Sequence, residues 1–336
     1  IKLVFYLSEL KGFDIMLYPL KLNAAFKDYL WGGTRLRDEF NKQTDIDPVA
    51  ESWELSCHHD GQSIISNGEF SGKTLAQYIE TVGKQVIGTK APKDKDFPIL
   101  IKFIDAKQSL SVQVHPDDKY ALLHEGESGK TEMWYVMDAT PDATLIYGFT
   151  HEISHQEFER RIKDNTLLEV CNQVPIKKGD VFFIEAGTLH AIGAGALIAE
   201  IQQSSNSTYR VYDYGRVGKD GKLRELHIEK ALAVTKLEPP TRKPEPIAKL
   251  TAFADYDLTI LAQCELFNVS HFDLHGNCSL NAKKDSFHSI LVLDGQIALT
   301  YGNDSFTITK GESVFIPADM GEYILNGTGE FILTTL

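Results

Sequence analysis

The chain has 336 residues, enough for about two domains at roughly 150 residues per domain. Hydrophobic residues make up 43% and charged residues 24%, a composition that excludes a disordered, collagen-like or coiled-coil chain. The formal net charge of −13 makes nucleic acid and anionic membrane surfaces poor partners, without excluding a small anion. The sequence has no run of about 18 apolar residues, so no membrane span is expected.

The start of the chain bears on its cellular location. Residues 1–15 precede Met16 and contain neither the apolar stretch nor the small-residue cleavage site of a signal peptide. We interpret them as a cloning remnant or an upstream extension, with the natural start at Met16. Four cysteines are scattered along the chain without a CxxC pair: Cys57, Cys171, Cys264 and Cys278. Without a secretory signal these thiols are expected to be reduced, which favours a cytoplasmic protein.

Helical patterns are few, and β-type patterns dominate. Apolar residues at helical spacing predict a helix over Lys73–Ile87. Ser154 followed by Glu157 indicates a capping box and a helix over Ser154–Val170, and a short third helix is predicted over His227–Lys236. The predicted strands are Phe97–Ile104, Met133–Met137, Thr144–Tyr147, Asp180–Ile184, Ala196–Gln202, Ser289–Leu293, Gln296–Tyr301, Ser305–Ile308 and Ser313–Ile316. Short strands between Gly, Asp and Asn turns predict a mainly β protein built from sandwiches or jelly rolls.

A proline-rich segment divides the chain. Four prolines within residues 237–249 exclude a helix or a central strand, so this segment is expected to be a linker or an edge crossing. It separates residues 16–236 from a shorter, β-rich part, residues 250–336. We therefore expect one domain on each side of the segment.

The two parts share a weak internal repeat. Gly179–His190 and Gly311–Glu322 each place a Gly turn before an apolar strand and a tight turn. Both copies resemble the second sequence motif of the cupin superfamily, but the second copy has Glu322 where the motif has its His. The resemblance implies two cupin-type jelly-roll modules, a catalytic first module with a small helical addition and a degenerate second module.

The densest polar cluster lies in the run Ser109–Asp118. The two-residue period of a strand would place Ser111, Gln113 and His115 on one face, with valines on the other. Such a strand is either a surface strand with one solvated face or a ligand-bearing strand inside a barrel.

Two further elements favour the ligand-bearing alternative. Lys130 and Glu132 share a face and lead into an apolar strand, and His190 ends the first cupin-like motif. Imidazole and carboxylate groups are ordinary ligands of a divalent metal, and imidazole favours Zn²⁺. We therefore predict a metal site formed by His115, Glu132 and His190, with Gln113 as a fourth donor. The alternative is that each His is an ordinary core or surface residue.

Three more groups carry candidate chemistry. Glu200 lies on the polar face of a predicted strand, and Arg210 lies between aromatic residues. Such an Arg binds a carboxylate or phosphate, or forms a structural pair, for example with Asp213. The run Cys57–Asp60 contains two adjacent His residues, which would point to opposite faces of a strand, so we do not expect a metal there.

The ordered motifs QVHPDD, KTEMWYV, EAGTLHAIGAG and IAEIQQSSNSTYRVYDYGR resemble type I mannose-6-phosphate isomerases, also called phosphomannose isomerases. The resemblance is strong over residues 17–236 and weak in the second module. It implies a zinc-dependent aldose–ketose isomerase with one Zn²⁺ per chain, which interconverts mannose 6-phosphate and fructose 6-phosphate through a cis-enediolate. The implied partner is a small phosphosugar, with no nucleic acid and no membrane, and the protein is expected to be a monomer or a weak homo-oligomer.

The resemblance also implies roles for individual residues. The implied zinc ligands are Gln113, His115, Glu132 and His190, the implied catalytic arginine is Arg210, and the implied phosphate-binding residues are Ser111 and Lys130. Glu200 is the expected proton carrier, although a zinc-bound water or another carboxylate remains an alternative. Two other hypotheses stay open, namely another metal-dependent cupin enzyme, such as an oxygenase or a different sugar isomerase, and a non-catalytic sugar-binding cupin.

Overall fold

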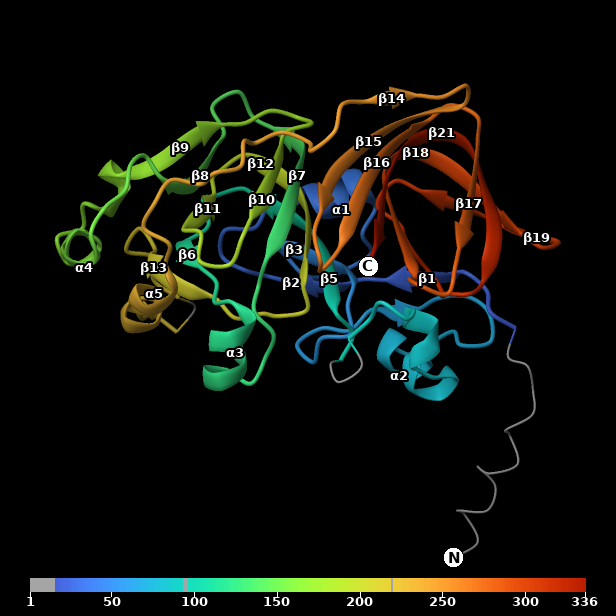
Figure 1. Cartoon of the computed structure of the whole chain (residues 1–336), viewed down its shortest axis with the longest axis horizontal. Helices are drawn as coiled ribbons and strands as arrows, with labels where there is room; N and C mark the ends of the chain where they lie inside the picture. Colours follow the sequence, from blue (N-terminus) through green and yellow to red (C-terminus); the bar gives the residue numbers. More distant parts are fainter. Residues whose placement is uncertain (1–15, 93–95, 219) are drawn as a thin grey trace, which may run out of the picture.

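The structure is a computed structural model, and it describes residues 16–92, 96–218 and 220–336. The proposed remnant or extension, residues 1–15, lies outside the described part. Two β-rich halves lie side by side, and the helices lie around them except for α1, which Figure 1 shows between the two halves. Within the described ranges, no helix is long and apolar enough to cross a membrane.

The first half is a sandwich of two antiparallel sheets. The six-stranded sheet has the order β10-β7-β12-β5-β3-β2, and the five-stranded sheet has the order β13-β6-β11-β8-β9. The strands of the first sheet are β2 (Ala25–Lys27), β3 (Glu51–Leu55), β5 (Ile99–Ala106), β7 (Glu132–Ala139), β10 (Val181–Ile184) and β12 (Ala196–Gln203). Those of the second are β6 (Val112–Val114), β8 (Thr144–Phe149), β9 (Cys171–Pro175), β11 (His190–Ile192) and β13 (Tyr209–Tyr212). Apolar side chains from both sheets, including Trp134, Tyr147 and Phe182, pack into one core between them.

The second half is built on a ten-stranded sheet with the order β14-β15-β16-β21-β18-β20-β1-β4, from which β17 and β19 branch. Its strands are β1 (Leu20–Asn23), β4 (Ile64–Ile65), β14 (Thr251–Ala252), β15 (Tyr256–Gln263), β16 (Asn268–Leu274), β17 (Asn277–Ala282), β18 (His288–Tyr301), β19 (Asp304–Thr309), β20 (Ser313–Ile316) and β21 (Gly321–Thr335). The N-terminal strand β1 pairs with β20, so that Leu20 lies opposite Phe315. The start of the described chain therefore belongs to the sheet of the C-terminal half.

The interiors of the two halves differ in chemistry. The interior of the second half is packed with apolar side chains, among them Phe272, Val292 and Phe331. A few polar side chains are also buried in the second half, among them Ser289, Ser313 and Thr334, and the partly buried His288 has its Nδ1 2.8 Å from the Tyr323 hydroxyl oxygen. The predicted metal ligands all lie in the interior of the first half.

Five α-helices and two 3₁₀ turns lie outside the sheets: α1 (Arg35–Phe40), α2 (Leu75–Val82), η1 (Lys84–Ile87), α3 (Asp118–His124), α4 (His155–Lys163), η2 (Leu167–Glu169) and α5 (Ile228–Val234), counted over the described ranges. The predicted helix over Lys73–Ile87 is interrupted at Gly83, whose φ of +111° suits glycine. Half of the predicted capping box is present, because the Ser154 side chain accepts a hydrogen bond from the Glu157 amide, but the Glu157 side chain binds Arg161 instead. The expectation of one helix over Ser154–Val170 is wrong, because α4 ends at Lys163 and η2 follows it. The unpredicted helices α1 and α3 span six and seven residues, too few for a clear apolar period.

The mainly β, cupin-type fold class predicted from the sequence is confirmed. One local expectation is wrong, because Ser289–Leu293 and Gln296–Tyr301 belong to a single strand, β18. The expected turn at Asp294 and Gly295 is a pairing irregularity inside that strand, where Gly295 has a φ of +81°. Residues 237–249 contain neither helix nor strand and run across the upper side of the molecule in Figure 1. The division of the chain at this segment stays a prediction.

Candidate metal centre and active site

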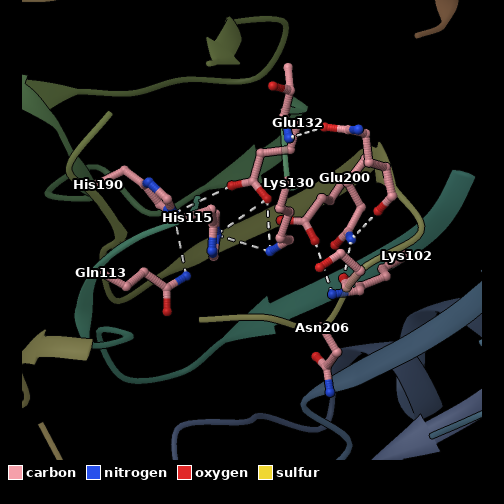
Figure 2. A network of polar contacts seen from close by, with 12 residues as sticks. Lys102, Gln113, His115, Lys130, Glu132, His190, Glu200 and Asn206 are labelled. Atoms are coloured by element: carbon pink, nitrogen blue, oxygen red, sulfur yellow. Dashed lines mark hydrogen bonds and ion pairs between the residues drawn. The ribbon is translucent and has the colours of Figure 1, made fainter. Parts of the chain in front are cut away.

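Four predicted ligands converge inside the first half. Strands β6 and β11 are antiparallel neighbours, and Gln113 lies opposite His190 in their register. His115 follows β6 directly, and Glu132 is the first residue of β7 in the other sheet. Side chains from both sheets therefore reach one interior point (Figure 2).

Three of these side chains lie close to one another, and Gln113 contacts one of them. The candidate ligand atoms of His115, Glu132 and His190 all lie within 4.8 Å of each other. Glu132 Oε1 lies 3.4 Å from His190 Nε2, and Glu132 Oε2 lies 3.6 Å from His115 Nε2. Gln113 Nε2 lies 3.4 Å from His190 Nε2. At most 1% of His115, Glu132 or His190 is exposed, so the cluster is shielded from water.

The hydrogen bonds of the two imidazoles determine which nitrogen atoms face the cluster. His115 Nδ1 lies 2.8 Å from the Ser207 carbonyl oxygen, and His190 Nδ1 lies 2.8 Å from that of Thr188. A carbonyl only accepts, so each Nδ1 carries the hydrogen and each Nε2 keeps a lone pair. Burial lowers the pKa of His190 to about 4 and the pKa of His115 well below its ordinary value. Both rings are therefore neutral at neutral pH, as metal ligation requires.

Glu132 and Lys130 complete the cluster. Burial raises the pKa of Glu132, and the charge of Glu200 raises it further. Lys130 Nζ lies 2.9 Å from Glu132 Oε2 and 3.0 Å from His115 Nε2. A metal ion would need these same lone pairs, so metal binding requires Lys130 to turn into the cavity that it also lines.

The donor set fits zinc. Two imidazoles, a carboxylate and an amide meet in a dry interior, and both imidazoles have the backbone carbonyl partners that orient His ligands in metal sites. Glu132 Oε1 is buried and accepts no hydrogen bond. A buried carboxylate oxygen without a donor is costly, and a bound cation would remove that cost.

A cavity of about 270 Å³ adjoins the cluster. Five predicted residues line it: Ser111, Gln113, Lys130, Glu200 and Arg210. The other lining residues with charged side chains are Glu51, Lys102 and Arg224, which sequence reasoning did not single out. The cavity wall therefore carries four cationic side chains and two carboxylates, and this excess of positive charge suits an anionic ligand. A larger hollow of about 850 Å³ lies near residues 263–268, and none of the eight predicted residues lines it.

Glu200 is held as an anion in the cavity wall. Its Oε1 lies 3.1 Å from Lys102 Nζ, and its Oε2 accepts a 2.8 Å hydrogen bond from Trp134 Nε1. Burial opposes ionisation of Glu200, but Lys102 and Lys130 outweigh it and lower the pKa. Glu200 is therefore ionised at neutral pH.

Lys102 is the main residue that the sequence reasoning missed. It is 3% exposed, and its Nζ lies 3.7 Å from Glu51 Oε2 as well as 3.1 Å from Glu200. Burial opposes its charge, but Glu51 and Glu200 outweigh burial and raise the pKa of Lys102. The sequence did contain a signal for this residue, because Lys102 is the only charged residue within the apolar predicted strand Phe97–Ile104. A charge buried in such a strand needs a partner of opposite charge.

The structure also decides between the alternatives for Arg210. Its suggested partner Asp213 binds other cations, with Oδ1 lying 3.1 Å from Arg216 Nε and 3.3 Å from Arg224 Nη1. Arg210 donates from Nη1 to the Glu225 carbonyl oxygen at 2.9 Å, and its buried Nε has no partner among the described residues. Arg210 therefore does not form the suggested pair with Asp213, and it lines the cavity.

The adjacent histidines in the run Cys57–Asp60 do not point to opposite faces. Their chain segment is a turn following β3, and the His58 and His59 rings stack with centroids 4.3 Å apart. Asp60 Oδ2 is engaged by Asn206 Nδ2 at 2.7 Å. The expectation of opposite faces assumed that β3 continues, and it was wrong for that reason.

Comparison with known proteins matches both halves of the chain. Residues 19–143 match the sequence model of the phosphomannose isomerase type I catalytic domain, and residues 257–336 match that of the mannose-6-phosphate isomerase cupin domain. The chain is 38% identical to mannose-6-phosphate isomerase ManA of Bacillus subtilis, over 95% of this chain and 99% of that protein. It is 36% identical to the mannose-6-phosphate isomerase of Streptococcus mutans, over 94% and 98%.

The fold agrees with these sequence relationships. The crystal structure of the mannose 6-phosphate isomerase from Bacillus subtilis superposes with a TM-score of 0.88 at 35% identity, covering 95% of this chain and 99% of that one. The similarity thus includes both halves and the interior of the first half.

Proposed function

The chain belongs to the type I mannose-6-phosphate isomerases, a family of enzymes, and from this premise we propose that it interconverts mannose 6-phosphate and fructose 6-phosphate with one bound Zn²⁺. The observation that carries the proposal is the convergence of two imidazole Nε2 atoms on the buried Glu132, beside a cavity with four cationic side chains. The proposed zinc ligands are Gln113, His115, Glu132 and His190.

The reaction moves a proton between C1 and C2 of the sugar and passes through a cis-enediolate. When bound, Zn²⁺ supplies Lewis-acid stabilisation of the negative charge that develops on the sugar oxygens. Arg210 is proposed to donate to the same developing charge, because it lines the cavity beside Gln113 and Glu200. Preorganised donors of this kind contribute about 10²–10³-fold to kcat.

Glu200 is proposed to carry the proton. It is an ionised carboxylate in the cavity wall, and Trp134 and Lys102 fix both of its oxygens. A carboxylate with a lowered pKa is a weak base in the resting site. Substrate binding would draw Lys130 toward the phosphate and away from Glu200, which would raise the basicity of Glu200.

Phosphate binding is proposed for Ser111 and Lys130. Ser111 is 3% exposed and lines the cavity together with Lys130. Binding energy from a phosphate distant from C1 and C2 would hold the sugar in its reactive position. The cations of the cavity would also attract this anion to an otherwise acidic protein.

The proposal is tested with purified protein and a coupled assay for fructose 6-phosphate. We expect turnover of mannose 6-phosphate, loss of turnover after chelation, and recovery with Zn²⁺ at one equivalent per chain. Glucose 6-phosphate serves as the substrate control. His190→Ala should lose metal and activity, whereas His271→Ala, which changes a histidine of the second half, should keep both. No turnover by the metal-restored protein would refute the proposal.

We further propose that the protein acts in the cytoplasm as a monomer or weak homo-oligomer. The four cysteines, Cys57, Cys171, Cys264 and Cys278, are free, as expected in a reducing compartment. Light scattering coupled to size exclusion measures the mass, and a concentration-independent dimer or larger assembly would contradict this part of the proposal.

A further inference from the structure

We propose that Glu127 is a positioning residue that holds His115 in its metal-binding orientation, acting through the segment Ser205–Ser207. The inference rests on the proposed metal site. Glu127 lies in the loop between α3 and β7 and does not itself reach the cluster. Its effect would be on the backbone carbonyl that orients His115.

The carboxylate of Glu127 binds three consecutive residues of that segment. Its Oε2 accepts hydrogen bonds from Ser205 Oγ at 3.2 Å, from the Asn206 amide at 3.3 Å and from Ser207 Oγ at 3.2 Å. One carboxylate oxygen thus accepts from three consecutive residues, so Glu127 contributes to the conformation of the whole segment.

The same segment reaches the metal cluster and the cavity. The Ser207 carbonyl oxygen is the acceptor for His115 Nδ1, at 2.8 Å. Asn206 lines the cavity, and its Nδ2 donates to Asp60 Oδ2 at 2.7 Å. A shift of the segment would therefore move the group that fixes the tautomer and ring direction of His115.

His58 supports Glu127 from the opposite side. The Asp60 amide donates to His58 Nδ1 at 3.1 Å, so His58 Nε2 carries the hydrogen. This Nε2 is buried and lies 3.6 Å from Glu127 Oε1. His58 of the Cys57–Asp60 run thus lies against Glu127, in a turn where candidate ligand atoms of His58, His59 and Asp60 also lie within 4.8 Å of one another.

Other contacts of the segment cannot replace Glu127. The Ser207 amide donates to Ser205 Oγ at 3.2 Å, and Gln202 Nε2 donates to the Ser205 carbonyl oxygen at 2.7 Å. Neither contact involves the Ser207 carbonyl oxygen, although the first also holds the Ser207 amide. The Glu127 side chain is 27% exposed, so water can partly replace it, and an intermediate effect is expected.

The test is the rate at which a chelating dye removes Zn²⁺ from the folded protein. Removing a partner of a metal-ligating His typically costs about 10–100-fold in metal affinity. Because Glu127 acts through one further residue, Glu127→Ala should release Zn²⁺ about tenfold faster, at the lower end of that range. Glu127→Gln keeps an acceptor oxygen and should recover most of the wild-type rate.

A matched control is available in the same loop. Glu125 binds Tyr209 Oη and Lys230 Nζ, each at 2.7 Å, and makes no contact with Ser205–Ser207, so Glu125→Ala should leave zinc release unchanged. Ser207→Ala removes one of the three donors and should accelerate release about threefold, with no added effect in the Glu127→Ala background. This variant decides the question if Glu127→Ala fails to fold.

The outcomes separate this inference from the proposed function. Wild-type protein that binds no Zn²⁺ would overturn the metal site and the positioning role with it. Normal zinc binding with unchanged release in Glu127→Ala and Ser207→Ala would overturn the positioning role alone. Equal acceleration in Glu125→Ala and Glu127→Ala would also overturn it, because the effect would then be one of general loop stability.

Discussion

The pair of Lys102 and Glu200 offers the sharpest test of the proposed catalytic chemistry. Lys102→Met leaves two buried carboxylates, Glu200 and Glu51, without their shared cation. At the observed 3.1 Å and an effective dielectric constant of about 20, the Coulomb energy of the Lys102–Glu200 pair is about 5 kcal/mol. Breaking a buried pair from one side typically costs about 3–5 kcal/mol of stability.

Both stability and catalysis should respond. We expect Lys102→Met to lower the free energy of unfolding by about 3–5 kcal/mol. Burial would then raise the pKa of Glu200, and loss of the 3.1 Å contact with Lys102 would leave Glu200 Oε1 unpositioned for proton transfer. Loss of general acid–base help lowers kcat by about 10²–10⁴-fold. Glu200→Gln should lower kcat over the same range, because the amide cannot accept the proton.

The double variant separates the two effects. Lys102→Met with Glu200→Gln removes both charges, so it should be more stable than the sum of the single changes by about 3 kcal/mol, while remaining inactive. Urea unfolding measures the first quantity and the coupled assay measures the second. Lys163 and Glu159 form an exposed pair at 2.6 Å and serve as the control, with an expected coupling of about 0.5 kcal/mol or less.

Two results would refute this reasoning. Additive stability changes at Lys102 and Glu200 would mean that the 3.1 Å contact is not an energetically coupled ion pair. Near-wild-type kcat in Glu200→Gln would mean that another group carries the proton, as the zinc-bound-water alternative requires. In that case the role of Lys102 would be structural.

Three further predictions follow from single contacts. Arg210→Ala should lower kcat about 10²–10³-fold while metal content and melting temperature stay at wild-type values, and retained activity would refute its role. Ser111→Ala should raise KM for mannose 6-phosphate about tenfold but leave KM for unphosphorylated mannose unchanged, because only a hydrogen bond to the charged phosphate is lost. Burial lowers the pKa of His288 to about 4, so between pH 6.5 and pH 4 the unfolded chain binds a proton that the folded chain does not. Stability should therefore fall by up to about 1.4 kcal/mol per pH unit as the pH decreases through this window, and His288→Gln should flatten that part of the urea-midpoint profile; equal slopes would contradict the assignment.

Local patterns predicted several strands, among them β5, β7 and β12, but missed others, including β1, β16 and β21, and could not assign strands to sheets. The alternation in Leu20–Asn23 buries Leu20 and Leu22, as expected for a strand with one covered face. Its partner, β20, lies almost 300 residues further along the chain. Strand pairing over that separation depends on the packing of the whole molecule, so no local pattern could assign β1 to the sheet of the C-terminal half.

The residues of the candidate site could be predicted where the two-residue period of a strand and the order of the motifs were enough to bring them together. The two-residue period correctly placed Gln113 and His115 on one face, and the register of β6 and β11 brings His190 to them. Lys102 and Glu127 were missed because their partners come from distant segments. A charged residue in the sequence is equally consistent with a buried ion pair and with an exposed position, and only the fold distinguishes the two.

The net charge of −13 illustrates the same limit for binding. Charges on an exposed surface are screened beyond about 8 Å at physiological ionic strength. A ligand in the cavity instead meets Lys102, Lys130, Arg210 and Arg224 against two carboxylates, in surroundings where water screens less. The sign of the charge in the cavity is therefore opposite to that of the whole chain, and an inference from net charge about extended polyanions does not carry over to a single phosphate. Whether the ligand is bound depends on where the fold places four cations, which composition does not record.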